Sequence, residues 1–349
     1  MSQASPAVLR GAVVGLGVMG THHARVLHST PGVELAAVVD PDLARRERAA
    51  AAQPGARPYP LLAEAVAAER LDFACVAVPV DRLAETASAA LAAGLHVLVE
   101  KPTAATEEQA ARLIAEAAER DRALGVGHIE RWNPAVVALK RKLDEGAIGR
   151  ILHLHARRLS PFPNRQGSHG VALDLATHDI DVMRYITGQE VARVFAEAAA
   201  PLGGGANEDI LCATLRLDDD SMGLIETNWM TPTKVRQLSV LGERGMLVVD
   251  YLTQDLTLFA HPTRATEWDA LAGIRGGGEG DMVRFALDRR EPLRVQWEEF
   301  LAALREGRPA PVSGADGLAA LSTARAIRDA AARQETVVPG YRMAADAVS

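Results

Sequence analysis

The sequence predicts an α/β protein in two parts, a doubly wound parallel sheet followed by an α+β domain with a mostly antiparallel open sheet. Three observations predict it. Through residue 129, apolar strands alternate strictly with helical segments, which is typical of a parallel sheet covered on both faces. Later strands follow one another through hairpin turns such as DDDS (218–221) and GERG (242–245). The length of 349 residues also favours two domains over one.

The first domain is expected to span residues 1–129. Its strands are predicted at 10–15, 33–40, 72–79, 95–100 and 124–129, and its helices near 18–30, 42–52, 61–69, 82–93 and 106–121. The second domain, 130–349, begins with a helix near 134–145, a strand at 150–159 and an apolar helix over 170–187 that Gly188 ends. Further strands are expected at 191–200, 209–217, 222–229, 235–242 and 245–252, and the last helices near 293–306 and 316–334. We allow for the last helix packing back on the first domain.

Composition and charge argue against several classes of protein. The formal charge of −7 without a long basic run gives no sign of nucleic-acid binding. No apolar run approaches the roughly 20 residues of a membrane span, and the N-terminus lacks the pattern of a secretory signal. We therefore expect a cytoplasmic protein. Cys75 and Cys212 lie in apolar, strand-like runs and are expected to be inert core thiols.

A glycine-rich loop follows the first predicted strand. The stretch GLGVMG places Gly15, Gly17 and Gly20 around Val18 and Met19, directly before a helix. Such glycines allow a tight turn and a close approach to a pyrophosphate, which the helix N-terminus then binds. Asp40 ends the second strand, near the spacing expected for a carboxylate that binds ribose hydroxyls. The pattern predicts a Rossmann-type domain that binds NAD, and a tight turn without a ligand is the alternative.

A second signal is a lysine at the end of a strand. The stretch VLVEKPT sets Glu100, Lys101 and Pro102 at the carboxyl edge of the parallel sheet, where ligands of such sheets bind. Pro102 fixes its own φ and biases Lys101 toward an extended backbone. This placement suits a catalytic lysine, and the alternative is a solvated lysine on a loop.

Together, GLGVMG, VLVEKP, GHIERWNPAV and DLATHDID resemble the glucose–fructose oxidoreductase, inositol 2-dehydrogenase and rhizopine-catabolism (Gfo/Idh/MocA) family, from about residue 9 through the late DGLAALSTA helix. The resemblance implies that Lys101 and His178 meet over the nicotinamide and that Asp174 touches the substrate. We also expect Pro79 and Glu100 to contact the cofactor. The chain departs from a pattern of many members, T-P-x-x-x-H, by carrying Val78 before Pro79 and Leu83 at the histidine position.

The helix over 170–187 carries polar residues on one stripe, namely Asp174, Thr177, His178, Asp181 and Tyr185. Polar and charged side chains buried with an apolar helix must be paired, bound to a ligand or functional. A metal site with help from His153 or His155 is one alternative, and a structural hydrogen-bond network is another. We favour acid–base catalysis, in which His178 transfers a proton, Lys101 donates to the developing alkoxide and Asp174 orients the neighbouring hydroxyl.

Two segments expected to border the cleft are rich in arginine. IERWNP carries Arg131 and Asn133, and HARRLSPFPNR carries Arg157, Arg158 and Arg165. Guanidinium groups bind phosphates bidentately, so these residues predict a phosphate-bearing substrate. The alternative is that the arginines pair with Glu130, Asp181 or a neighbouring subunit. The same stretches resemble the branch of the family that includes UDP-N-acetylglucosamine 3-dehydrogenases, which makes that nucleotide sugar the first candidate and inositol the second.

The sequence thus predicts an NAD-dependent dehydrogenase acting on a secondary hydroxyl of a sugar, nucleotide sugar or cyclitol. Asp40 disfavours the 2′-phosphate of NADP, although Arg45 and Arg46 lie nearby. A reductase of another C=O or C=N bond is an alternative, and so is a dinucleotide-sensing protein without activity. We expect no metal, and a small-molecule substrate as partner rather than nucleic acid or a membrane. An exposed antiparallel sheet face favours a homodimer or homotetramer.

Overall fold

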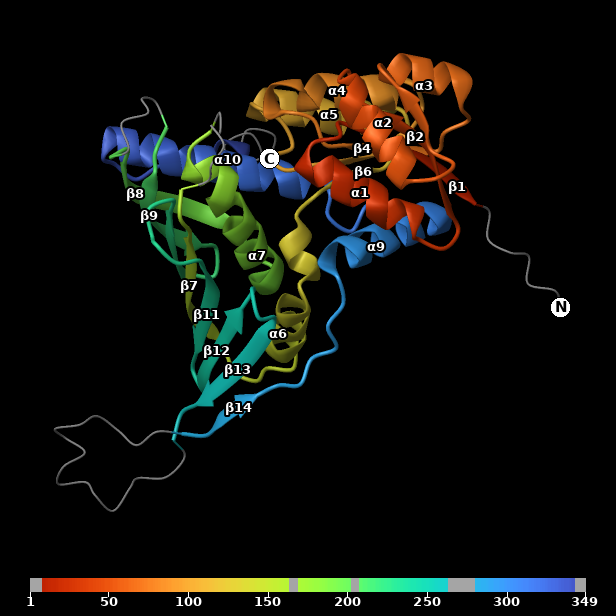
Figure 1. Cartoon of the computed structure of the whole chain (residues 1–349). Helices are drawn as coiled ribbons and strands as arrows, with labels where there is room; N and C mark the ends of the chain where they lie inside the picture. Colours follow the sequence, from red (N-terminus) through yellow and green to blue (C-terminus); the bar gives the residue numbers. More distant parts are fainter. Residues whose placement is uncertain (1–7, 163–168, 202–206, 263–279, 343–349) are drawn as a thin grey trace, which may run out of the picture. The chain divides into compact units, whose positions relative to one another are not determined.

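The computed structural model describes residues 8–162, 169–201, 207–262 and 280–342 of the chain (Figure 1). The chain forms two compact units. The first contains the described residues up to Ile129 and returns with Glu291–Leu321, and the second contains those of Glu130–Arg290 and those from Ser322 onward. The segment 291–321, which the sequence analysis assigned to the second domain, therefore belongs to the first unit.

The first unit is built on a six-stranded parallel sheet in the order β3-β2-β1-β4-β5-β6. Its strands are β1 (Leu9–Val14), β2 (Val33–Val39), β3 (Arg57–Tyr59), β4 (Phe73–Val76), β5 (His96–Val99) and β6 (Leu124–Val126). The order reverses between β1 and β4, so the carboxyl ends of these two strands border the crevice where such sheets bind ligands. β3 was not predicted, because its three residues include no apolar run.

Helices cover both faces of this sheet (Figure 1). They are α1 (Val18–His28), α2 (Leu43–Ala52), α3 (Leu62–Ala68), α4 (Val80–Ala92), α5 (Glu107–Glu119) and α9 (Pro292–Glu306). In one core layer, Leu27 of α1 and Trp297 and Phe300 of α9 join Phe73 and Cys75 of β4. The other layer includes Ala65 of α3. The burial of Trp297 and Phe300 explains why the late segment belongs to the first unit.

The second unit contains an eight-stranded sheet in the order β14-β13-β12-β11-β7-β10-β9-β8. Its strands are β7 (Ile151–Leu159), β8 (Val191–Ala199), β9 (Ile210–Leu217), β10 (Met222–Asn228), β11 (Val235–Gly242), β12 (Gly245–Asp250), β13 (Asp255–Ala260) and β14 (Met282–Arg284). β7 and β10 pair in parallel and all other neighbours pair antiparallel, which confirms the predicted fold class. The strands β13 and β14 were not predicted.

The remaining elements are the 3-10 turn η1 (Ile129–Trp132), α6 (Pro134–Asp144), the π-helix η2 (Ala172–Ala176), α7 (Thr177–Thr187) and α10 (Gly314–Arg333). α7 packs on one face of the second sheet, where Arg158 of β7 bonds to Asp179 and Gly223 of β10 lies against Met183. His153, His155 and Arg157 alternate with buried residues of β7 and lie on the opposite face. None of the described helices has the length and apolar character needed to cross a bilayer.

Candidate active site

The glycine loop has the geometry of a phosphate-binding turn. Gly15 has a φ of +89°, which favours glycine, and a side chain on Gly20 would collide with the carbonyl oxygen of Gly15. A side chain on Gly17, in contrast, would meet nothing within 4 Å. Gly17 is the N-cap of α1, which begins at Val18, and it provides no side-chain cap, so the first N–H groups of the helix can bind an anion. The loop therefore fits a dinucleotide pyrophosphate.

Asp40 is held beside this loop. The side chain is buried, its Oδ2 accepts the N–H of Leu16 at 2.7 Å, and its Oδ1 accepts the N–H of Asp42 at 2.9 Å. A cavity of about 570 Å³ is lined by Gly15, Asp40, Arg45, Val78, Pro79 and Arg82. This size suits part of a dinucleotide. The predicted residues Gly15, Asp40 and Pro79 thus border one cavity.

Two arginines of α2 differ in their surroundings. Arg45 lines the cavity with its Nη1 4.0 Å from Asp40 Oδ2, so it faces the carboxylate rather than only solvent. Arg46 donates to the carbonyl oxygens of Asp40 and Pro41. Leu83, which stands where many relatives carry histidine, is buried in α4 and offers no polar contact.

Glu100 follows β5 and is engaged within the protein. Its Oε1 lies 2.7 Å from Nε2 of His23, and its Oε2 accepts the backbone N–H of Lys101 at 3.2 Å. A side chain on Gly127 would lie 2.9 Å from Oε1, so the carboxylate also packs against the end of β6. The geometry therefore does not support the predicted cofactor contact of Glu100. Its carboxylate contacts His23 and the backbone of Lys101 instead. The Lys101–Pro102 peptide bond is cis.

The charge state of His23 follows from its neighbours. Burial lowers the pKa of His23, but a Cys75 thiolate and Glu100 together would raise it to about 10. Burial raises the pKa of the Cys75 thiol, so this neighbour is uncharged and its part of the rise is absent. The indole Nε1 of Trp297, which only donates, lies 2.9 Å from His23 Nδ1, and an imidazolium would set two N–H groups against each other there. His23 is therefore neutral, accepts at Nδ1 and donates from Nε2 to Glu100.

The DLATHDID segment is not one regular α-helix. Asp174 lies in the π-helix η2 and His178 in the first turn of α7, so the predicted α-helical spacing is interrupted by a wider turn of a kind often found at functional sites. Glu208 accepts the N–H of Ala172 at 2.9 Å and so satisfies one donor at the start of the segment. From residue 171 to 184, Asp174 and His178 are partly exposed and every other side chain is buried.

Asp181, the fourth member of the predicted stripe, has a structural partner. It is fully buried, and Arg131 donates to its two oxygens at 2.8 and 2.6 Å. The Arg131 guanidinium also lies 5.1 Å from the centre of the Tyr185 ring. Arg131 is thus bound bidentately by a carboxylate, and its predicted contact with a substrate phosphate has no support in the structure.

Arg158 is also paired with carboxylates of the protein. Its Nε and Nη2 donate to Asp179 at 2.8 and 2.9 Å, and its Nη1 donates to Glu130 at 2.9 Å. Asn133 caps α6 and donates to the carbonyl oxygen of Tyr251 at 3.2 Å. For Arg131 and Arg158 the structure therefore corresponds to the alternative of pairing with Glu130 and acidic residues of α7. These pairs hold η1, β7 and α7 together.

The other predicted residues lie away from α7. Arg157 is on the opposite face of the second sheet and donates to Glu226 at 3.1 Å. Arg165 lies outside the described residues. His153 and His155 share the face of Arg157, and the described part of the chain contains no group of three or more His, Cys, Asp or Glu placed to bind a metal. Cys212 is exposed, so the prediction of a core thiol is wrong for Cys212, whereas Cys75 is buried.

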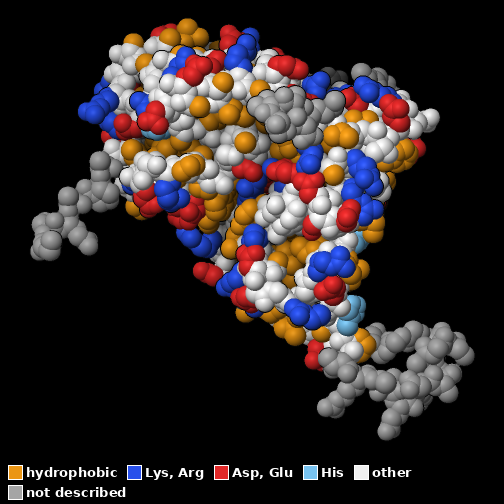
Figure 2. Space-filling model, turned by 180° about the vertical axis from the view of Figure 1, so that it is seen from behind, with side chains coloured by type: hydrophobic (Ala, Val, Ile, Leu, Met, Phe, Trp, Pro, Cys, Tyr) orange, Lys and Arg blue, Asp and Glu red, His pale blue; other side chains and the backbone are white. Residues whose placement is uncertain are grey.

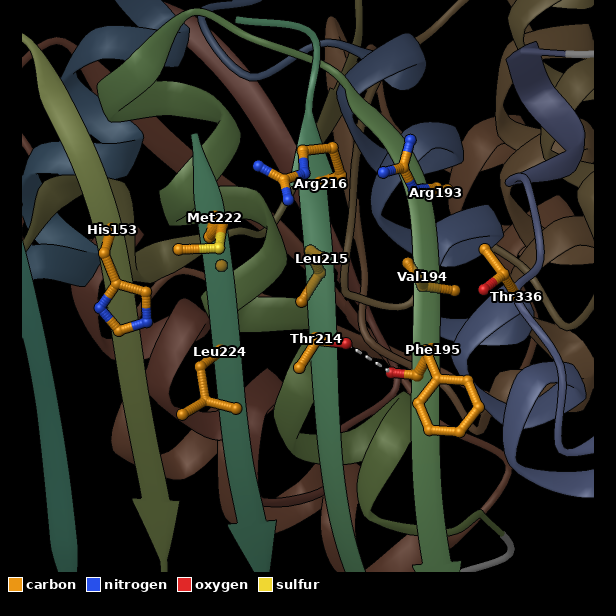
Figure 3. Close-up of a pocket in the computed structure, with 11 residues that line it drawn as sticks. His153, Arg193, Val194, Phe195, Thr214, Leu215, Arg216, Met222, Leu224 and Thr336 are labelled. Atoms are coloured by element: carbon orange, nitrogen blue, oxygen red, sulfur yellow. Dashed lines mark hydrogen bonds between the residues drawn. The ribbon is translucent and has the colours of Figure 1, made fainter. Parts of the chain in front are cut away.

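A second cavity, of about 400 Å³, lies on this opposite face (Figure 3). Its lining includes Arg193, Phe195, Arg216, Met222 and Leu224 from β8, β9 and β10 (Figure 3). Because Asp174 and His178 belong to the segment packed on the other face, this cavity is separate from the candidate active site. On the molecular face in Figure 2, basic and acidic side chains are interspersed rather than gathered in one basic patch.

Sequence reasoning missed Arg236 of β11, because the polar residue of an alternating strand is expected to face solvent. Arg236 lies opposite Arg158 in the sheet and donates to the carbonyl oxygens of Leu159 and Val235 at 2.7 and 3.0 Å. Burial and the charge of Arg158 lower the pKa of Arg236 to about 10, against the influence of Asp179, Glu130 and Asp174. Arg236 is therefore a half-buried cation in the surroundings of Asp174.

Comparisons with known proteins agree with this geometry. A family model described as an oxidoreductase family with an NAD-binding Rossmann fold matches residues 9–128, and a GFO/IDH/MocA C-terminal domain matches residues 136–248. UDP-N-acetylglucosamine 3-dehydrogenase of Acidithiobacillus ferrooxidans is 29% identical over 320 residues, 92% of this chain and 96% of the relative. A solved structure of that enzyme, 28% identical, has a TM-score of 0.81 and covers 92% of this chain and 97% of its own. Inositol 2-dehydrogenase 1 of Saccharopolyspora erythraea is 31% identical over 334 residues, 91% of this chain and 92% of the relative.

Proposed function

The chain belongs to the Gfo/Idh/MocA oxidoreductases and contains their NAD-binding domain, and on this premise we propose that it is a dehydrogenase that oxidises a secondary hydroxyl with NAD. One observation carries the proposal. In a segment whose other side chains are buried, η2 and the start of α7 expose Asp174 and His178. Lys101 follows Glu100 at the carboxyl end of β5, the edge of the sheet that also carries the glycine loop.

Each residue has a role set by its chemistry. The glycine loop and the α1 N-terminus would bind the pyrophosphate and Asp40 the adenosine ribose, and bound NAD supplies the hydride acceptor. His178 takes the proton of the reacting hydroxyl, which an imidazole does well near neutral pH. The Lys101 ammonium stabilises the developing negative charge on that oxygen. Asp174 accepts a hydrogen bond from the neighbouring hydroxyl and so orients the sugar ring.

We propose a nucleotide sugar, UDP-N-acetylglucosamine oxidised at its 3-hydroxyl, as the first candidate substrate, and inositol as the second. The relative at 29% identity over nearly the full chain supports the first, and the inositol dehydrogenase at 31% supports the second. Arg131 and Arg158 are paired and Arg157 lies on the other face of the sheet, so none of these three arginines supports a substrate phosphate. Arg236, a half-buried cation in the surroundings of Asp174, supports an anionic group on the substrate.

The test measures turnover of each candidate substrate with NAD, monitored through the absorbance of the reduced nicotinamide. We expect oxidation of one of the two, and that Lys101→Met removes it while NAD affinity, measured by calorimetry, is unchanged. His178→Asn should lower kcat by roughly 10² to 10⁴. Lys140→Met, which changes a surface lysine paired with Asp144, is the matched control and should turn over normally.

Other outcomes would favour the alternatives. NAD binding without oxidation of either compound, or of a wider panel of sugars, would favour the non-enzymatic sensor. NADH consumption with a carbonyl or imine compound would favour the reductase. Near-normal turnover by Lys101→Met would contradict the mechanism itself.

A further inference from the structure

His23 and Trp297 are two fully buried residues of the first unit that the proposed chemistry does not use. The imidazole and indole rings meet edge to face with their centres 5.7 Å apart. His23 belongs to α1, the helix that begins at the glycine loop, and Trp297 belongs to α9, which returns to the first unit from late in the chain. Glu100, the third member of the cluster, directly precedes Lys101.

The hydrogen bonds in this cluster have a defined direction. Trp297 donates to Nδ1 of His23, which leaves Nε2 of His23 to donate to Glu100 at 2.7 Å. Glu100 accepts from His23 with one oxygen and from the backbone N–H of Lys101 with the other. A buried carboxylate is expensive unless such donors satisfy it. If His23 could not donate, Glu100 would lose the bond that fixes its orientation toward Lys101.

We propose that His23 and Trp297 are positioning residues for the oxidation, acting through Glu100 to hold the backbone of Lys101. The inference rests on the proposed function, in which Lys101 acts on the reacting oxygen. The same bonds tie α1, whose first turn would bind the cofactor phosphates, to the strand end that carries Lys101. Misplacing a reacting group by about 1 Å lowers a rate by on the order of 10²-fold, so a loss of this bond should be visible in kcat.

The first experiment compares two replacements of His23 in the full-length protein. His23→Leu keeps much of the volume but removes the donor, and we expect kcat to fall by roughly tenfold to a hundredfold while the Kd for NAD changes less than threefold. His23→Gln retains an N–H donor and should recover a substantial part of the loss. The backbone amide of Lys101 should exchange its hydrogen faster in His23→Leu than in the wild type.

The second experiment needs no His23 variant, and its measurement of the tautomer needs no substrate. Nitrogen chemical shifts of the wild-type imidazole should report the Nε2–H tautomer at His23, and Trp297→Phe, which keeps a ring but removes the donor, should disturb that tautomer and lower kcat. An imidazolium or an Nδ1–H tautomer in the wild type would overturn the proposal. The proposal would also be overturned if His23→Leu and Trp297→Phe both kept the kcat of the wild type and its protection of the Lys101 amide from exchange. A protein that turns over no substrate but shows the expected tautomer and amide exchange would contradict only the proposed function.

Discussion

Three aspartates lie in the segment 174–181, and their burial gives them different roles. Asp179 and Asp181 are buried, and each is bound by two nitrogens of one arginine. Asp174 is partly exposed from η2. A buried carboxylate needs a cation to offset its desolvation. Asp179 and Asp181 therefore stabilise α7, and Asp174 is the aspartate that we propose orients the substrate.

This difference predicts opposite effects of two chemically identical substitutions. Asp181→Asn leaves the Arg131 charge buried without its partner and should lower the free energy of unfolding by about 3–5 kcal/mol. Asp174→Asn should change stability by less than about 1 kcal/mol while lowering kcat/KM on the order of 10²-fold through loss of substrate orientation. Urea denaturation and steady-state kinetics on both variants would check this. Equal stability losses in the two variants would contradict the assignment.

A second prediction at the residue scale is that Asp40 determines the cofactor preference. A 2′-phosphate at ~4 Å from this carboxylate would meet a repulsion of about 4 kcal/mol at an effective dielectric of ~20, more than a hundredfold in affinity. Arg45 and Arg82 line the same cavity and reduce this repulsion. We expect higher kcat/KM with NAD than with NADP, and a further loss of NADP use in Arg45→Ala. Equal catalytic efficiency with both cofactors would show that Asp40 does not decide the preference.

At the scale of elements, apolar runs and turn residues sufficed to predict most strands and helices. Among the strands, the exceptions are β3, β13 and β14. β3 and β14 have three residues each, too few to show an apolar pattern. β13 alternates polar and apolar residues only from Asp255 to Leu258, before Phe259 and Ala260 break the pattern. The π-turn at 172–176 depends on contacts such as that of Glu208 with Ala172, from a residue 36 positions away. Similarly, the sequence shows the arginine of IERWNP but not its partner. Arg131 bonds to Asp181 of α7, 50 positions later, and this pairing follows only from the fold.

The loop after Lys101 ends in a capping box, which gives a prediction for this element. Thr106 caps α5 by accepting the N–H of Gln109 at 3.3 Å, and the Gln109 side chain accepts the N–H of Thr106 at 3.2 Å. Thr106→Ala should lower the free energy of unfolding of the first unit by about 1 kcal/mol. Thr106→Ser keeps a hydroxyl that can accept the same N–H and should therefore retain most of the stability that the cap provides. Urea transitions of the two variants measure the difference, and identical midpoints for Ala and wild type would refute the cap.

At the scale of the whole molecule, the chain divides the proposed chemistry between its units. Lys101 belongs to the first unit, whereas Asp174 and His178 belong to the second. The chain passes between the units after Ile129, after Arg290 and after Leu321, and α9 supplies Trp297 and Phe300 to the core of the first. A fragment ending at residue 129 would therefore lack part of its own core.

The open face of the second sheet bears on assembly. Register places Phe195, Thr214, Leu224, His155, Ser239 and Val248 in one row across six strands, and Met222, His153, Leu241, Met246, Phe259 and Met282 in the next row. Met222 is 46% exposed and Met282 67% exposed. Exposed apolar side chains gathered on one sheet face mark an interaction site more often than scattered ones do. The rows continue across both sides of β7, so the surface extends well beyond the cavity in Figure 3.

We therefore expect a homodimer or homotetramer formed through this face, because a closed symmetric assembly buries the same patch on each copy. Light scattering after size exclusion should give a multiple of the 37.1 kDa chain mass. The double variant Met222→Glu and Leu224→Glu places one charge in each row and should shift the protein to monomer. Val137→Glu changes an exposed apolar residue of α6 instead and should leave the assembly intact. A wild-type monomer at micromolar concentration, or an oligomer that survives the double variant, would place the interface elsewhere or exclude it.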